Sequence, residues 1–171
     1  MNSNLKHIFR FAILILVQVL ILNNVYLGGY INPFIYLLFL MLMPFGIDRI
    51  WLLILGFITG LTVDLFSGGV IGLHTAAATF VAFLRPYLLN MISSQREYDS
   101  SIEPSIKDMG FSWFLGYTLL FTTSHHLYYF FIEKFSFNDF FITLWRIFLS
   151  MLVSSVMIIV GQYIEHRPKH K

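Results

Sequence analysis

The chain has 171 residues, of which 57% are hydrophobic and 12% charged, and its formal net charge is +2. Soluble domains carry about 25% charged residues, so this composition excludes an ordinary soluble protein and predicts an all-α integral membrane protein. A span needs roughly 20 residues, so the length allows about five or six spans and no folded domain outside the membrane. The sequence has no cysteine, which excludes disulfides, thiol catalysis and thiolate metal sites.

The apolar runs predict one bundle of about six transmembrane helices. The spans are expected at about residues 8–27, 33–45, 50–66, 70–92, 110–132 and 140–164. The first begins like a signal peptide, but no Ala-x-Ala site follows it, so we expect it to be retained as a helix. The second is short and carries Pro44 near its end, which favours a tilted or irregular segment. In the fourth, Arg85 followed by Pro86 is expected to break or end the helix near the membrane surface.

The basic residues predict the orientation of this bundle. Six spans place both chain ends on one side, and the only substantial polar loop, residues 93–108, lies on that side too. With the ends in the cytoplasm, these basic residues fall on the inner side or at its margin: Lys6, Arg10, Arg49, Arg85, Arg96, Lys107, Arg167, Lys169 and Lys171. Only Lys134 then lies in an outer loop, and Arg146 lies inside the sixth span. The asymmetry fits the positive-inside rule, so both termini are expected to be cytoplasmic.

One face of the third span carries small residues and an acid. Gly56, Gly60 and Asp64 are four residues apart and therefore share a helix face. We expect another helix to pack closely against the two glycines and a polar partner to meet the carboxylate. The turn that follows contributes the remaining glycines of this motif, Gly68, Gly69 and Gly72.

Ionisable residues from four spans are expected in the outer leaflet, as a cluster of Asp64, His74, His125 and Arg146. In one interpretation Asp64 pairs with Arg146 or a nearby histidine and forms a polar site open to the outside. In the other, Asp64 caps the following turn through the amides around residues 67–69. We favour a structural role for Asp64, to which either capping or ion pairing could contribute. Arg146 also has a simpler interpretation, since its long stem can reach the outer headgroups.

The pair His125-His126 invites a metal site, but adjacent helical residues point about 100° apart and rarely share an ion. We therefore expect interfacial histidines and no metal. No nucleophile, base and orienting acid can be placed together, and no phosphate loop or paired carboxylate is present. We expect no enzyme activity, no cofactor and no nucleic-acid partner.

The block Gly56-Phe57-Ile58-Thr59-Gly60-Leu61-Thr62-Val63-Asp64-Leu65-Phe66-Ser67-Gly68-Gly69, followed by Gly72-Leu73-His74-Thr75-Ala76, resembles the rod shape-determining protein MreD family. The chain length, the position of this block in the third and fourth spans and the charged loop after the fourth agree with that resemblance. The motif-specific part covers only about residues 56–85. The aromatic run at 128–141 is unlike a typical member.

The resemblance implies a component of the bacterial inner membrane that works in peptidoglycan elongation with the MreC protein and the MreB cytoskeleton. It also implies a fold similar to the substrate-binding membrane subunits of energy-coupling-factor transporters, and it supplies no catalytic residues. The leading interpretation is a non-enzymatic scaffold that maintains rod shape by binding an MreC-like single-span protein and, through it, MreB and the wall synthases. The alternative is a small-ligand-binding or transport subunit with an outward-facing polar pocket. A channel is disfavoured, because span six is largely apolar from Arg146 to Glu165.

Overall fold

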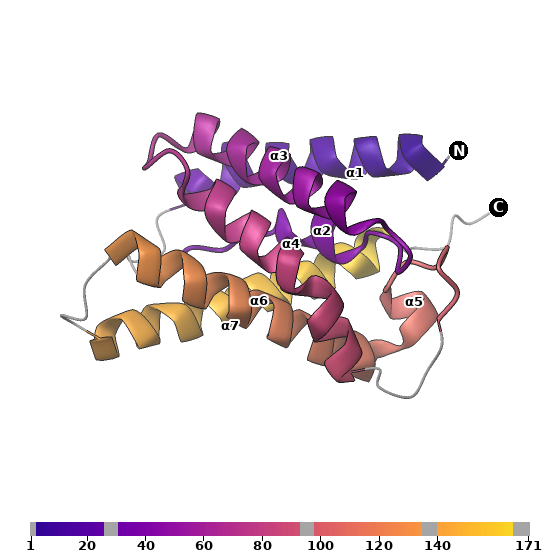
Figure 1. The fold of residues 1–171 in the computed structure, drawn as a ribbon. Coiled ribbons are helices and arrows are strands. Elements are labelled where there is room, and N and C mark those ends of the chain that lie inside the picture. The colour runs from indigo at the N-terminus through magenta and orange to yellow at the C-terminus, as the bar shows by residue number, and fades with distance from the viewer. Residues whose placement is uncertain (1–2, 26–30, 93–97, 135–139, 166–171) are drawn as a thin grey trace.

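The computed structural model describes residues 3–25, 31–92, 98–134 and 140–165, and these residues contain helices and no strand. The long helices run side by side (Figure 1). In chain order the elements are α1 (Ser3–Leu16), the π-helical turn η1 (Val17–Ile21), the 3₁₀ turn η2 (Leu22–Asn24), α2 (Leu37–Met41), α3 (Arg49–Ser67), α4 (Leu73–Ile92), α5 (Ile106–Met109), α6 (Phe111–Lys134) and α7 (Phe140–Glu165).

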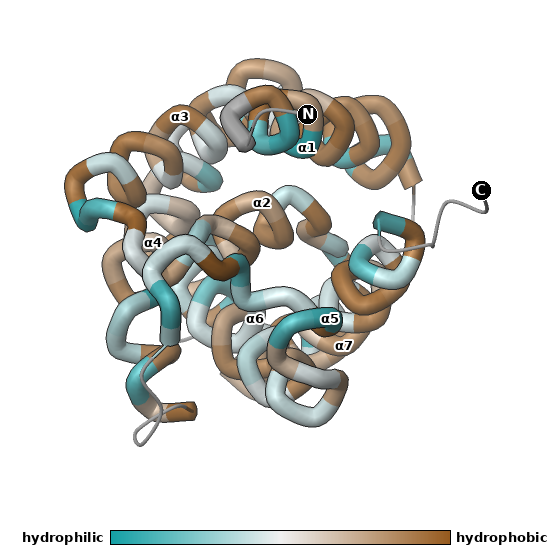
Figure 2. The backbone as a smooth tube through the Cα atoms, turned by 90° about the vertical axis from the view of Figure 1, so that its right-hand side faces the viewer, coloured by the Kyte–Doolittle hydropathy of each residue, from teal (hydrophilic) through white to brown (hydrophobic). Residues whose placement is uncertain are grey.

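Viewed along the helices, α2 lies at the centre and α1, α3, α4, α6 and α7 surround it (Figure 2). All five residues of α2 are buried, whereas many large apolar side chains on α1, α3 and α7 are exposed. An exposed apolar surface of this extent is expected where a protein meets lipid.

Four helical stretches are long and apolar enough to cross a membrane: Leu5–Asn24, Arg49–Ser67, Leu73–Ile92 and Phe140–Glu165. They correspond to the first, third, fourth and sixth predicted spans and are compatible with a multi-pass membrane protein. The fifth predicted span, 110–132, forms the helix α6, but its many hydroxyl and histidine side chains make it more polar than these four. An all-helical fold with four candidate spans is therefore present in the described residues.

The second predicted span, 33–45, is not a regular helix. Its first residues are non-helical, and only Leu37–Met41 forms α2. The expected irregularity is present, and its cause is the position of the segment inside the protein, where neighbouring side chains replace the helical hydrogen bonds.

Local sequence signals set both ends of α3, but the proline in α4 does not end that helix. Asp48 caps α3 by accepting hydrogen bonds from the amides of Ile50 (2.8 Å) and Trp51 (3.3 Å). The helix ends at Gly68, which adopts the left-handed conformation with a φ of 66°. By contrast, Pro86 does not end α4, which continues to Ile92. The predicted break at this position is therefore wrong.

Candidate functional site

Gly56 and Gly60 bring α3 into direct contact with α4. A Cβ added at Gly56 would lie 2.8 Å from Ala82 Cβ and 3.0 Å from Ala78 O. One added at Gly60 would lie 2.6 Å from the backbone nitrogen of Thr75. Backbone atoms cannot move aside as the end of a side chain can, so a larger residue at position 60 would push the helices apart. The glycine face is thus occupied by α4 of the same chain.

Asp64 is 2% exposed and binds the first turn of α4. Its Oδ2 accepts hydrogen bonds from the amides of Gly72 and Thr75, both at 2.9 Å, and from Thr75 Oγ1 at 2.5 Å. Its Oδ1 accepts from the amide of His74 at 3.0 Å. The first amides of a helix have no partner within the helix and form its positive end. A single carboxylate therefore satisfies this end of α4 and offsets its partial charge.

The structure favours capping over ion pairing for Asp64, with a different set of amides from the one expected. The expected donors lay around residues 67–69, whereas the donors observed belong to residues 72–75. The turn between them depends on Gly68 and Gly72, whose φ angles are 66° and 99° and favour glycine. Gly69 has no such requirement. Its expected Cβ position has only Ser67 Oγ nearby, at 3.9 Å.

Two of the predicted cluster residues, His74 and His125, meet at a tyrosine that the sequence analysis did not single out. The hydroxyl of Tyr36, which directly precedes α2, lies 2.8 Å from His125 Nε2 and 3.3 Å from His74 Nδ1. The hydroxyl of Tyr129 lies 3.4 Å from His74 Nε2. All four side chains are buried. Asp64 joins this group only through the backbone amide of His74.

Arg146 is not part of this histidine-tyrosine group and instead contacts Glu133 and Phe130. Its Nη1 lies 3.3 Å from Glu133 Oε2, and its guanidinium lies 4.8 Å from the ring centre of Phe130. The expected pairing with Asp64 or a histidine is absent from the ion pairs among the described residues. The outer-leaflet cluster of four is therefore divided into a buried histidine-tyrosine group and a separate, partly exposed ion pair.

His125 and His126 are fully buried, so both imidazoles lie inside the helix bundle and not on its outer surface. His126 Nδ1 lies 2.7 Å from Thr122 O, and because a carbonyl only accepts, Nδ1 must carry the proton. His126 Nε2 lies 3.1 Å from Ser154 Oγ, which also accepts a hydrogen bond from the amide of Phe34 (2.9 Å). The two imidazoles bind different partners, as their divergence along the helix requires.

Polar side chains on the surrounding helices hold the non-helical segment that precedes α2. The amide of Asn32 donates to Ser150 Oγ (3.0 Å) and that of Ile35 to Gln18 Oε1 (2.9 Å). Gln18 Nε2 donates to Pro33 O (3.0 Å). Irregular backbone at membrane depth is tolerated only where the protein satisfies its polar groups. A sequence signal for these contacts exists but was missed: Gln18 and Ser150 are polar residues within otherwise apolar helices.

Arg85 performs the same role at the other end of α2. It is 1% exposed, so its side chain lies inside the bundle and not on the outer surface of the protein. Its Nε donates to Tyr117 Oη (3.0 Å), and its Nη2 donates to the carbonyl oxygens of Met41 (3.2 Å) and Met43. Tyr117 also donates to Met41 O (3.3 Å). The guanidinium thus supplies donors to carbonyls at the end of a short helix.

An ion-pair network joins α1, the polar loop and α7 at one end of the bundle. Glu103 binds Lys6 Nζ at 2.9 Å and Arg10 Nη2 at 2.8 Å, and Arg10 also binds Glu165 at 2.5 Å. Partial burial alone would raise the pKa of Glu103, but the hydrogen bonds and charges of Lys6 and Arg10 outweigh it and lower this pKa below its ordinary value. The network places the beginning of α1 and the end of α7 side by side.

In these arrangements the buried polar side chains mostly bind groups of the protein itself. Within residues 3–25, 31–92, 98–134 and 140–165, no group of three His, Asp or Glu side chains is placed to hold a metal ion. Comparison of the chain with protein-family models, with curated proteins and with solved structures finds no match. The motif at residues 56–75 is therefore best described by what it does locally: it packs α3 on α4 and caps α4.

Proposed function

We propose that this chain is a non-enzymatic membrane scaffold of the bacterial cell-wall elongation machinery, an MreD-like protein that helps to maintain rod shape. The protein would be located in the bacterial inner membrane. Its partners would be an MreC-like single-span protein and, through it, the MreB cytoskeleton and the wall synthases. The observation that carries this proposal is that the block resembling the MreD family, Gly56 to Asp64, forms a close internal contact between α3 and α4.

The use of buried polar groups supports a scaffold over a catalyst. Asp64, Arg85 and Ser154 each bind backbone groups of the chain. A general acid, base or nucleophile must instead be within reach of a substrate. Side chains engaged in this way stabilise one arrangement of helices, and a stable arrangement is what a protein that positions partners needs.

The proposed topology has six crossings with both termini in the cytoplasm. The pair between Arg10 and Glu165 supports an even number of crossings, because it joins the beginning of α1 to the end of α7. The segment 31–45 and α6 would supply the two crossings beyond the four apolar helices. The positive-inside rule then favours the cytoplasm for this end. We extend the proposal to a fold similar to the substrate-binding subunits of energy-coupling-factor transporters.

A small-ligand-binding or transport subunit is the second candidate, and one observation favours it. The Nδ1 atom of His125 is buried and has no hydrogen-bond partner in the described part of the chain. It lies beside the broken segment that leads into α2, and discontinuous segments line the binding sites of many transporters. Against this candidate, the hydroxyl of Tyr36 already binds both His74 and His125, which leaves few free groups to recognise a ligand.

Depletion of the protein in its native host separates the two candidates. The scaffold proposal expects rounded cells and delocalised wall synthesis. Normal rods that require an added nutrient would refute it and support the ligand-binding candidate. Co-purification in mild detergent provides a second measurement, since an MreC-like single-span protein should be recovered with the chain.

Complementation with His125→Gln makes this comparison specific to the candidate ligand site. Glutamine can still hydrogen-bond to Tyr36 but removes the imidazole. Provided that the variant elutes as a single species and unfolds close to the wild type, the scaffold proposal expects restored rods. A folded variant that leaves normal rods dependent on the added nutrient would indicate binding at His125.

A further inference from the structure

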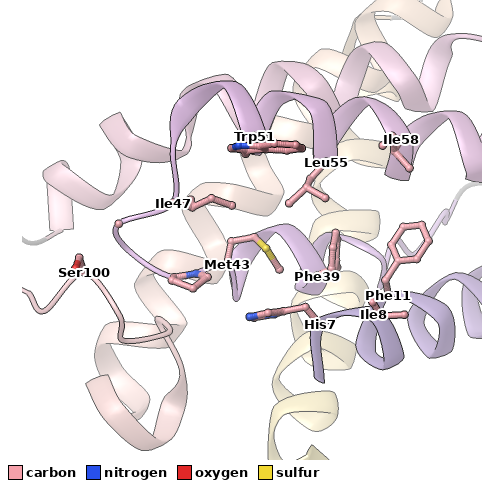
Figure 3. Close-up of a pocket in the computed structure, with 12 residues that line it drawn as sticks. His7, Ile8, Phe11, Phe39, Met43, Ile47, Trp51, Leu55, Ile58 and Ser100 are labelled. Carbon is pink, nitrogen blue, oxygen red and sulfur yellow. The ribbon is translucent and has the colours of Figure 1, made fainter. Parts of the chain in front are cut away.

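A lateral groove separates α1 from α3, and its floor is formed by α2 and the residues just after it (Figure 3). Phe11 of α1 lies opposite Leu55 and Ile58 of α3, and Phe39 and Met43 lie behind them. The groove has a volume of about 590 Å³. The first half of α1 therefore stands apart from α3, whereas α3 and α4 approach to backbone contact.

The helix α1 has little apolar packing to hold it in place. Only 28% of the most apolar part of Leu5–Asn24 is buried, the lowest share among the four candidate spans. Leu14 and Ile15, in the second half of α1, are buried, whereas Leu5 and Phe9, in the first half, are exposed. A segment with few buried apolar contacts separates from the rest of a fold more easily than a core element does.

Polar contacts hold α1 at both ends instead. Near its beginning, Arg10 binds Glu103 at 2.8 Å and Glu165 at 2.5 Å, and Lys6 binds Glu103 at 2.9 Å. After its other end, Gln18 is 1% exposed and binds the backbone of the segment before α2. Gln18 lies in the π-helical turn η1, and sharp bends in helices occur at such turns.

A rigid helix that pivots at η1 moves most at its beginning. Lys6 lies about 18 Å from Gln18 along the helix axis, at the helical rise of about 1.5 Å per residue. A rotation of about 15° at the pivot therefore moves this end by about 5 Å. The ion pairs oppose that movement, because they join the moving end of α1 to the polar loop and to α7.

We propose that α1 is a lateral gate of the bundle, which pivots at η1 and is kept closed by the ion pairs of Lys6 and Arg10 with Glu103 and Glu165. Breaking these pairs moves the first half of α1 away from α3, widens the groove and exposes its floor at Met43. The long stems of the freed basic side chains let their charges reach headgroups or water, so opening leaves no charge in the lipid. The inference goes beyond the scaffold function and does not depend on it.

The reactivity of introduced cysteines tests the gate, since the chain has no cysteine of its own. Met43→Cys places a thiol in the floor of the groove, where the native side chain is 3% exposed. Ala77→Cys is the control, at a fully buried position of α4 outside the groove lining. Each is studied with and without Glu103→Gln and Glu165→Gln, which remove the charges but keep the side-chain size. The measurement is the rate of labelling by a small membrane-permeant thiol reagent in mild detergent, which follows the population of the open form.

The two cysteines separate opening of the gate from general loosening. Removing the ion pairs should make Met43→Cys react at least about fivefold faster, the effect of losing one charged contact, and should leave Ala77→Cys unchanged. An unchanged rate at Met43→Cys would overturn the proposal, and so would an equal increase at both positions. If the double-glutamine variant does not fold, Lys6→Met removes the more exposed of the two cations and provides the same comparison.

Spin labels measure the direction of the movement. Phe9→Cys on α1 and Ile50→Cys on α3 form the reporting pair, and Phe57→Cys on α3 with Met91→Cys on α4 forms the control pair, all at exposed positions. Removing the ion pairs should add a longer distance to the reporting pair and none to the control pair. An unchanged distance distribution in the reporting pair would contradict the gate, as would a change of the same size in the control pair.

Discussion

Replacing Asp64 by asparagine should destabilise the protein although the side chain keeps its shape. The carboxylate accepts four hydrogen bonds, three through Oδ2 and one through Oδ1. The best orientation of asparagine keeps its oxygen in the Oδ2 position and turns its amide nitrogen toward the amide of His74. Two donors then face each other, and the buried amide of His74 is left without an acceptor.

The expected loss follows from two contributions. An unsatisfied buried donor costs about 1–3 kcal/mol, and removing a charge from a partly buried helix N-terminus costs about 0.5–2 kcal/mol. Together they predict a decrease of about 2–4 kcal/mol in the free energy of unfolding. For a chain of this length, the midpoint of thermal unfolding should fall by roughly 5–15 °C.

Thermal unfolding in a mild detergent measures this loss, and amide hydrogen exchange at residues 72–75 measures its position. Asp48→Asn is the matched control, because Asp48 caps α3 with two amides from an exposed position. Its expected cost is about 1 kcal/mol or less. The reasoning is refuted if Asp64→Asn unfolds within 1 °C of the wild type, or if it is no less stable than Asp48→Asn.

Three further substitutions test other parts of the fold. Gly60→Ala should lower stability by about 2 kcal/mol or more because its Cβ meets backbone atoms of α4, whereas Gly116→Ala, which has open space, should be neutral or stabilising; equal unfolding midpoints would contradict the close contact. Arg85→Met should cost about 3 kcal/mol by leaving buried carbonyls without donors, and a variant as stable as the wild type in denaturant titration would exclude this role. Glu103 has a lowered pKa, so its ion pairs stabilise the folded state above its ordinary pKa and lose this effect as the pH falls through the lowered value. Glu103→Gln should therefore be less stable than the wild type at neutral pH and equally stable in acid, and a wild-type advantage that persists in acid would contradict the assignment.

The sequence determined the class of fold because hydropathy is a local property. Runs such as 50–66 must be helical if they lie in lipid, since a helix satisfies its own backbone, and α3 matches this run closely. The four-residue spacing of Gly56 and Gly60 likewise fixed a packing face, because helical geometry alone places both on one side. For 33–45 the sequence predicted an irregular span, and only Leu37–Met41 is helical, because a segment shielded by its neighbours need not satisfy its own backbone.

Only the tertiary structure decided which partner each polar side chain meets. The sequence around Asp64 allowed either a turn cap or an ion pair. In the structure its hydrogen-bond donors lie at the start of α4, beyond the turn. Arg85 looked like an interfacial residue because it precedes a proline, yet it binds carbonyls more than 40 residues away along the chain. Such contacts depend on how helices are arranged in space. Hydropathy and spacing fix the helices and their faces, but they do not fix which helix each face meets.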